Sequence, residues 1–260
     1  MSFGSIASDY DRLRPRPSPA AVDWLLPARR DVVVDLGAGT GLLSRVLAGK
    51  AGHVIAVEPD DRMRSVLQDR SPGVEVLAGR GEAIPLPDGS ADVVLVSSAW
   101  HWMDPELAVP EIARVLRDHG RFGLLWNSRD RSAQWIRTAD WFRAEDLPAA
   151  QTPAGMGSPA EVSQSPPPET LEWDGRRVPM AAPCRFENIE TAVFRFSRWM
   201  TPSDLADMLT TYSRIITADP DVRAAGRARA AAALAAEFPG AREIEVPMQS
   251  RCWRADRTAR

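Results

Sequence analysis

The chain has 260 residues, a formal net charge of −3 at pH 7 and a pI of about 5.7, which suit one domain with a full hydrophobic core. No basic stripe stands out, so charge does not favour nucleic-acid binding, and no apolar run has the length of a signal peptide or membrane span. Cys184 and Cys252 match no metal-ligand spacing, so we expect two free thiols in a reduced cytoplasm and no metal site.

Two short helices are predicted before the first strand. Ile6, Tyr10 and Leu13 recur at helical spacing, and the stretch Arg14–Pro17 ends the helix because each proline disfavours helical conformation in the residue before it. A second helix is predicted over residues 20–26. On this pattern alone, Tyr10 could be a packing aromatic and Arg14 a surface charge.

A glycine-rich loop follows the first predicted strand, 32–36. The strand is apolar except for Asp35, the loop contains Gly37, Gly39 and Gly41, and apolar residues at helical spacing come next. This pattern predicts a buried strand, a tight loop and a helix N-terminus, the first unit of a doubly wound sheet. Glycines allow the backbone to approach a ligand closely, and the free N–H groups that open a helix favour an anionic group.

The glycine spacing separates two kinds of nucleotide-binding loop. The dinucleotide fingerprint G-x-G-x-x-G needs a glycine where this chain has Leu42. Asp-x-Gly-x-Gly-x-Gly instead resembles motif I of the class I S-adenosylmethionine-dependent methyltransferases. The resemblance implies cofactor binding by Asp35, Gly37, Ala38, Gly39 and Gly41. The alternative is an ordinary strand–turn–helix whose glycines serve only the turn.

A second apolar strand, 53–58, ends in Glu58. An acid about 20 residues beyond such a loop can accept hydrogen bonds from both ribose hydroxyls of a nucleoside. Alternatively, Glu58 caps the next helix, whose start is indicated by Pro59 and the two aspartates after it. Pro59 and Met63 are also assigned to the cofactor site. A third strand is predicted over 74–77.

Two further stretches resemble the trans-aconitate methyltransferase subgroup of this family. They are Tyr10-Asp11-x-x-Arg14-Pro15 and Glu82-x-Ile84-Pro85-Leu86-Pro87-Asp88. In that subgroup the first folds over the cofactor as a lid, although Pro17 stands here where an aromatic is usual. Arg80 replaces a residue that meets the adenine amino group, and arginine cannot accept a hydrogen bond. We therefore assign the adenine to Gly81 and Glu82.

The fourth predicted strand, 91–96, is apolar after Asp92, as a central parallel strand should be. Ligands in open α/β sheets bind beyond the carboxyl ends of the strands, so the residues that follow should line the site. The subgroup also has Ala-x-His-Trp-x-Asp here. We assign Ser98 to the cofactor and Trp100 and Trp102 to the acceptor. His101 either transfers a proton, orients the acceptor or only braces the loop.

The next segment is predicted to contain a helix from Pro105 to Leu116, with Leu107, Ile112 and Leu116 facing inward and Gly120 ending it. A fifth strand, 122–126, places Trp126 and Asn127 at its tip as acceptor-binding residues. A helix over 130–147 should follow.

The composition changes over residues 148–183, where proline, serine and glycine dominate. Such a stretch builds no core and is expected to be a loose loop or a flap ordered on binding, mobile over 149–180. Beyond it we predict a strand over 191–196 and a helix opened by a capping box at Thr201. An alanine-rich helix from Asp219 to about Phe238 and a reversed final strand over 243–253 complete the chain.

These elements predict a Rossmann-like doubly wound α/β fold. The seven-stranded sheet should be mostly parallel with an antiparallel final strand, helices on both faces and an N-terminal helical lid. We expect one domain over 1–260: the lid (1–30), the cofactor-binding half (31–128), a helix with the flap (129–190) and C-terminal strands and helices (191–260).

The predicted function is methyl transfer from S-adenosylmethionine, which leaves S-adenosylhomocysteine, to a small organic acceptor. An aromatic or carboxylate metabolite of secondary metabolism is expected, with His101, Tyr10 and Arg14 as catalytic candidates. The aromatic residues and the absence of a basic patch favour this acceptor over RNA, DNA or protein. We expect no membrane partner and a cytoplasmic monomer or homodimer. The alternatives are a protein that binds S-adenosylmethionine without methylating, and a nicotinamide oxidoreductase, which Leu42 disfavours.

Overall fold

The computed structural model describes residues 7–137, 170–173, 176–179, 186–216 and 218–259. The strands are β1 (Val32–Leu36), β2 (His53–Glu58), β3 (Glu75–Ala78), β4 (Ala91–Ser97), β5 (Leu116–Arg129), β6 (Thr170–Trp173), β7 (Arg176–Pro179), β8 (Phe186–Met200) and β9 (Ile244–Arg257). The helices are α1 (Ala7–Leu13), α2 (Pro19–Leu25), α3 (Ser44–Leu47), α4 (Asp61–Arg70), the 3₁₀ helix η2 (Trp100–Trp102), α5 (Pro105–Val115), α6 (Gln134–Arg137), α7 (Pro202–Thr210), α8 (Ser213–Ile216) and α9 (Pro220–Glu237).

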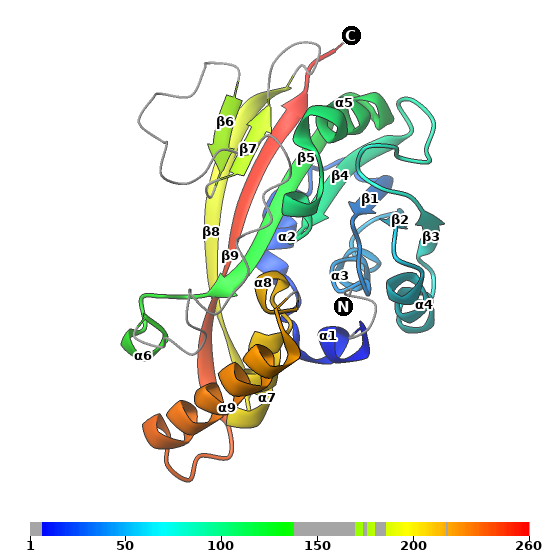
Figure 1. Cartoon of the computed structure of the whole chain (residues 1–260). Helices are drawn as coiled ribbons and strands as arrows, with labels where there is room; N and C mark the ends of the chain where they lie inside the picture. The colour runs from blue at the N-terminus through cyan, green and yellow to red at the C-terminus, as the bar shows by residue number, and fades with distance from the viewer. Residues whose placement is uncertain (1–6, 138–169, 174–175, 180–185, 217, 260) are drawn as a thin grey trace.

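Seven strands form one twisted sheet in the order β3-β2-β1-β4-β5-β9-β8 (Figure 1). Strands β1 to β5 pair in parallel, whereas β9 runs antiparallel to both of its neighbours, β5 and β8. The predicted Rossmann-like sheet with a reversed final strand is therefore confirmed. Because β1, β2 and β4 are parallel, the residues that follow each of them emerge at the same edge of the sheet.

The central strands are buried on both faces, which explains their continuous apolar sequence. Val33 and Val93 face a core with α2 and α3, while Val34 and Val94 face a second core with α5. The inward face of α5 is Ala108, Val109, Ile112 and Val115. Leu107, which the sequence had suggested faces inward, is 55% exposed. Cys252 is buried and unbridged, and burial raises the pKa of its thiol to about 12; Cys184 lies outside the described residues.

The junction of α5 and β5 differs from the prediction. The helix ends at Val115 and the strand begins directly at Leu116, so Gly120 lies within β5 and terminates no helix. The pairing with β4 shifts register here, and His119 adopts a φ of 62°, which together mark a bulge. A Cβ at Gly120 would lie 2.8 Å from the Arg117 carbonyl oxygen, so the glycine serves close backbone approach.

The glycine loop, residues 37–41, opens a shorter helix than predicted. Turns continue to Leu43, and α3 covers only Ser44–Leu47. In the second half, β6 and β7 form an antiparallel pair inside the stretch that was expected to be a loop. Asp174-Gly175 between them is a hairpin signal that the compositional argument overlooked. The rest of the expected flap and most of the helix expected over 130–147 lie outside the described residues.

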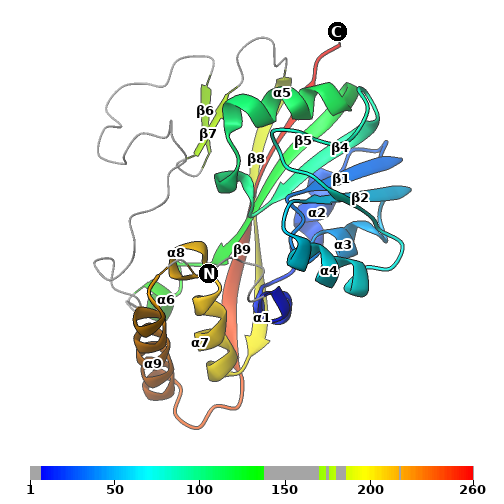
Figure 2. The same cartoon turned by 45° about the vertical axis from the view of Figure 1, so that its right-hand side comes forward.

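Strand β8 is more than twice as long as the predicted strand 191–196, and β9 is slightly longer than the predicted strand 243–253. Both extend beyond the parallel strands (Figure 1). Helices α7 and α9 pack on this extension and form a third core with Met200, Leu205, Leu234 and Met248. Figure 2 shows α1, α7 and α8 gathered at one end of the sheet, where β5 emerges. Within the described ranges, no helix combines the length and apolar composition needed to cross a bilayer.

The N-terminal segment, residues 7–18, is fastened across this end of the sheet. Arg12 donates a hydrogen bond to Asp204 at the start of α7 (2.7 Å), and Asp11 accepts one from Arg45 on α3 (2.5 Å). Arg198 of β8 donates to the last carbonyl oxygens of α1, those of Arg12 and Leu13. These contacts hold α1 over the carboxyl ends of the parallel strands.

A buried polar network fixes the end of the same segment. Asn127 on β5 donates from its side-chain amide to the Pro15 carbonyl oxygen (3.2 Å) and accepts a hydrogen bond from the Ser250 hydroxyl (2.6 Å). The Ser18 backbone N–H donates in turn to Ser250. Both hydrogen-bonding ends of the Asn127 amide are therefore used to hold the chain, although the residue borders the cavity described below.

Replacing Asn127 by alanine is expected to loosen the N-terminal segment selectively. The variant leaves the Pro15 carbonyl and the Ser250 hydroxyl without their buried partner, a loss of about 1–3 kcal/mol. Native-state hydrogen exchange should show faster exchange of the amides of residues 7–14, with β1 and β4 unchanged. Ser128→Ala, which removes a hydrogen bond from Gln249 on the same strand pair, serves as the control. Equal exchange in both variants would contradict this role.

Candidate active site

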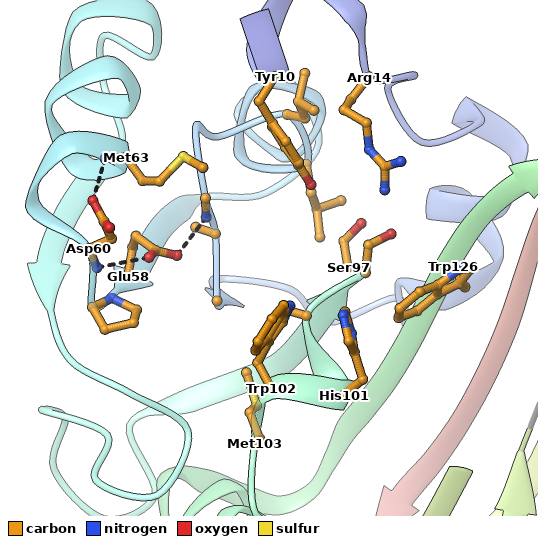
Figure 3. Close-up of a pocket in the computed structure, with 18 of the residues that line it drawn as sticks. Tyr10, Arg14, Glu58, Asp60, Met63, Ser97, His101, Trp102, Met103 and Trp126 are labelled. Atoms are coloured by element: carbon orange, nitrogen blue, oxygen red, sulfur yellow. Dashed lines mark hydrogen bonds between the residues drawn. The ribbon is translucent and has the colours of Figure 1, made fainter. Parts of the chain in front are cut away.

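A cavity of about 550 Å³ lies at the carboxyl ends of β1, β2, β4 and β5, beneath α1 (Figure 3). Its size is in the usual range for small-molecule and cofactor sites. It is lined by Tyr10, Arg14, Pro15, Pro17, Gly37, Ala38, Gly39, Leu42, Leu43, Glu58, Pro59, Asp60, Met63, Arg80, Gly81, Glu82, Ser97, Ser98, Ala99, His101, Trp102, Met103, Trp126, Asn127, Tyr212 and Ile216.

The glycine loop forms one wall of the cavity. Gly37 and Gly39 have φ values of 70° and 57°, in the left-handed region that favours glycine. At Gly37 a Cβ would come within 2.7 Å of the Ala99 side chain, so that position requires close packing. At Gly39 a Cβ would meet no atom within 4 Å, so it would project into open space. The Gly39 backbone is therefore exposed to any molecule that fills the cavity.

Glu58 stands at the tip of β2 and faces the same space. Its carboxylate accepts hydrogen bonds from the backbone N–H groups of Gly39 (2.8 Å) and Asp60 (2.9 Å), drawn as dashed lines in Figure 3. Burial raises the pKa of Glu58, and these two hydrogen bonds offset part of the rise. Asp60 caps α4 by accepting from the N–H groups of Arg62 and Met63, which fixes this corner.

A third wall comes from the loop after β3 and the segment after η2. Met103 packs so closely on Gly81 that a Cβ there would lie 2.6 Å from the methionine sulfur. The Glu82 carboxylate accepts a hydrogen bond from the Asp104 backbone N–H (2.8 Å), which ties the two loops together. Gly81 therefore allows Met103 to pack closely against the chain. Glu82 both connects the two loops and borders the cavity.

The aromatic wall is formed by residues that follow β4 and by β5. The ring of His101 lies 4.9 Å from both the Trp102 and Trp126 rings, tilted on the first and edge-on to the second. Ser98 adopts a φ of 56°, an unusual conformation for a residue with a side chain, and its N–H is held by the Leu125 carbonyl (2.8 Å). The turn at Ser98 directs the chain into η2, which carries His101 and Trp102 to the cavity.

The opposite side of the cavity is covered by the N-terminal segment and the residues before α8. The Arg14 guanidinium lies 4.4 Å from the centre of the Tyr212 ring and 5.4 Å from that of Tyr10. Figure 3 shows Tyr10 of α1 and Arg14, the residue after α1, reaching into the cavity across from His101 and Trp126. Residues more than one hundred positions apart in the sequence thus meet in one site.

Three of the residues assigned to the site from sequence do not line the cavity: Asp35, Gly41 and Trp100. Trp100 is 2% exposed and packs on Phe122 in the core. Asp35 is 1% exposed and accepts a hydrogen bond from the Ser44 hydroxyl (2.5 Å), so it braces the glycine loop from behind. Gly41 faces Ser71 and Leu67, where a Cβ would lie within 3 Å of both.

Several lining residues were missed by sequence reasoning. Ser97 and Asp60 adjoin residues that had been assigned, so a wider window around each strand end would have found them. Met103 follows the His-Trp pair but looks like an ordinary core residue. Tyr212 and Ile216 belong to the C-terminal third, and no local signal links them to the glycine loop. They reach the cavity because α7 packs beside α1 and α8 packs on α7.

The buried Asp35 is expected to make the stability of the protein depend on pH. Burial raises its pKa from 3.8 to about 7, and the Ser44 hydrogen bond offsets part of the rise. The folded protein therefore holds a proton that the unfolded chain releases, so the free energy of unfolding should fall as pH rises from about 4 to 7, by up to about 4 kcal/mol. Denaturant titrations across this range measure the fall.

The variant Asp35→Asn should lose most of this decrease, so that the difference between the two proteins isolates Asp35 from the contribution of Glu58. Asp69→Asn, on the exposed side of α4, changes the net charge equally and should follow the original protein. A decrease of the same size in Asp35→Asn would contradict the assignment.

Comparison with known proteins identifies the family. A family model described as a methyltransferase domain matches residues 34–124. An uncharacterized methyltransferase of Mycobacterium bovis is 39% identical over 223 residues, covering 86% of this chain and 81% of the relative. An uncharacterized methyltransferase-like protein of Schizosaccharomyces pombe is 38% identical over 140 residues, covering 52% of this chain and 55% of the relative.

A solved structure from Anaeromyxobacter dehalogenans, described as a candidate type II methyltransferase, shares the fold. It has a TM-score of 0.66 and 23% identity, covering 94% of this chain and 97% of its own. The region that the family model matches, 34–124, contains the glycine loop, Glu58 and His101, which all contribute to the cavity beneath α1. The chain therefore belongs to the methyltransferase family and is an S-adenosylmethionine-dependent enzyme.

Proposed function

We propose that the protein transfers a methyl group from S-adenosylmethionine to a small organic acceptor held against His101. The observation that carries the proposal is the shared cavity, in which the glycine loop and the His101 aromatic wall face each other. An aromatic or carboxylate metabolite suits these walls. Under this proposal, the protein belongs to the trans-aconitate subgroup and acts in secondary metabolism. It is a cytoplasmic monomer or homodimer with one domain per chain.

The residues around the glycine loop fit the cofactor. Gly39 offers exposed backbone where a Cβ would project into the cavity, and Glu58 presents a carboxylate beside it that can accept the two ribose hydroxyls. Pro59 and Met63 would border the nucleoside, and Gly81 with Glu82 the adenine. When bound, the cofactor supplies a methyl group that its sulfonium already activates for displacement.

The chain contributes chiefly alignment and a dry environment. Holding two reactants in line can lower a barrier by about 7–11 kcal/mol. The rings of Trp102 and Trp126 on one side and of Tyr10 on the other give the cavity mostly apolar walls, which would exclude water and suit a positive charge lost during the reaction. Such walls favour a planar organic acceptor over a large, highly charged one.

His101 acts on the acceptor in this proposal. It stands on η2 after β4, one strand away from the glycine loop, so it could contact an acceptor that lies beside a cofactor held by that loop. If the acceptor atom carries a proton, His101 removes it directly or through water, a step worth about 10²–10⁴-fold. If the acceptor is an ionised carboxylate, no base is required and His101 orients it by hydrogen bonding.

The variant Gly39→Val is expected to lose cofactor binding while remaining folded. Its side chain would enter the space beside Glu58, where the nucleoside is proposed to lie. Gly240→Val is the matched control, because Gly240 also has a left-handed φ (75°) and open space around it but does not border the cavity. Calorimetric titration with S-adenosylmethionine should show binding only in the control. Unchanged affinity in folded Gly39→Val would overturn the proposed cofactor position.

The variant His101→Ala is expected to separate the two roles of this residue. Loss of a base should lower turnover by about 10²-fold or more and remove the ascending limb of the pH–rate profile. Loss of an orienting group should instead raise the acceptor KM. In both cases S-adenosylmethionine affinity should stay nearly unchanged.

The assay is a mass-spectrometric screen of small acceptors with isotopically labelled cofactor. His53→Ala is the control, because His53 pairs with Glu75 on the surface at the start of β2. Unaltered turnover, KM and pH profile in His101→Ala would exclude His101 from the reaction.

A further inference from the structure

Arg14 differs from the arginines around it in its lack of an acidic partner. Arg12 pairs with Asp204 and Arg45 pairs with Asp11. The Nη1 atom of Arg14 is buried and has no hydrogen-bond partner among the described residues, and no carboxylate of those residues forms an ion pair with it. The Tyr10 and Tyr212 side chains form hydrogen bonds with the guanidinium but bring no carboxylate charge. A buried cation without a counter-charge is costly, so its presence needs an explanation in the function of the site.

The surroundings of Arg14 hold the guanidinium in place without neutralising it. Tyr10 and Tyr212 present their rings to it at 5.4 and 4.4 Å, a cation–π arrangement that fixes the head group. Arg129 also interacts with Tyr212 but does not border the cavity, and burial lowers the pKa of its guanidinium although Tyr212 offsets part of the effect. Arg14 therefore makes this side of the cavity electropositive.

The acidic residues of the cavity lie elsewhere. Glu58 and Asp60 occupy the β2 corner, and Glu82 is held by the Asp104 N–H on the loop after β3. In Figure 3, Glu58 and Asp60 lie across the cavity from Arg14. The acidic residues of the cavity, together with Arg80 after β3, therefore lie on one side, which suits sugar hydroxyls, and Arg14 lies on the other side, which suits an anion.

We propose that Arg14 binds a carboxylate of a molecule in the cavity. The Nη1 atom of Arg14, which borders the cavity, carries two N–H donors and has no hydrogen-bond partner among the described residues. A planar guanidinium can meet a carboxylate with two parallel hydrogen bonds. The Tyr10 and Tyr212 rings hold it in the required orientation. This inference rests on the proposed function and adds to it the chemistry recognised at Arg14.

Two molecules could bring that carboxylate. One is the cofactor, whose amino-acid end carries a carboxylate, and the other is the acceptor. The chemistry at Arg14 is the same in both, an organic carboxylate paired with a guanidinium. Ligands with and without the carboxylate-bearing group can therefore distinguish them.

The test compares matched ligand pairs by calorimetry. S-Adenosylhomocysteine is compared with 5′-methylthioadenosine, which lacks the amino-acid carboxylate. Benzoate is compared with benzamide in the presence of saturating S-adenosylhomocysteine. Each pair is titrated into the original protein, Arg14→Gln, Arg14→Lys and the control Arg16→Gln, because Arg16 is exposed on the same segment and does not line the cavity.

Arg14→Gln should weaken one carboxylate ligand by about 10- to 100-fold and leave its uncharged counterpart unchanged. Loss confined to S-adenosylhomocysteine assigns Arg14 to the cofactor, and loss confined to benzoate assigns it to the acceptor. Arg14→Lys should retain part of the affinity, because it keeps the charge but not the two parallel donors. Arg16→Gln should bind like the original protein.

The proposal is overturned if both carboxylates bind Arg14→Gln as tightly as the original protein. It is also overturned if 5′-methylthioadenosine is weakened as much as S-adenosylhomocysteine, because Arg14 would then only shape the cavity. Methyl transfer in the original protein is measured separately, so either result leaves the proposed methyltransferase function standing.

Discussion

Parallel pairing of β1, β2 and β4 is the constraint on which the site depends. It brings the glycine loop, Glu58 and the His101 turn to one edge of the sheet, although they are separated by more than 60 residues of chain. The pairing is stable because both faces of these strands are buried by helices. A ligand at this edge meets residues whose positions are set by the core, which preorganises the cavity.

The site is covered by α1, and charged and polar contacts hold this helix in place. Apolar packing gives α1 little hold on the parallel strands, since only Ala7 and Leu13 of that helix are buried. The Asp11–Arg45 and Arg12–Asp204 pairs and the Asn127 network compensate by joining it to α3, α7 and β5. Directional contacts of this kind fix the register of Tyr10 and Arg14 over the cavity more closely than apolar packing would.

Sequence reasoning failed where one residue type serves two structural purposes. Gly120 was interpreted as a helix end, whereas it permits a bulge in β5 against the Arg117 carbonyl. The stretch around Asp174-Gly175 was predicted to be a loop because the residues around it are rich in proline. The average composition hid the local hairpin signal of this dipeptide. Trp100 and Trp102 could not be distinguished by sequence, but Trp100 points toward the core from its position in η2. Local patterns do not distinguish these cases because the deciding contacts come from other strands.

The sequence by itself determined the parallel half of the fold and the chemistry at its edge, because apolar strands, turn glycines and strand-terminal acids are local signals of 5 to 10 residues. It therefore predicted Gly37, Gly39, Glu58 and His101 as cavity residues. Family resemblance also predicted Tyr10 and Arg14 as lid residues, but only the tertiary structure decided which side chains they meet over the cavity. Tyr212 meets Arg14, and Asn127 meets Pro15, across separations of 198 and 112 residues, and contacts over such distances depend on how α7, α8 and α1 pack on the finished sheet.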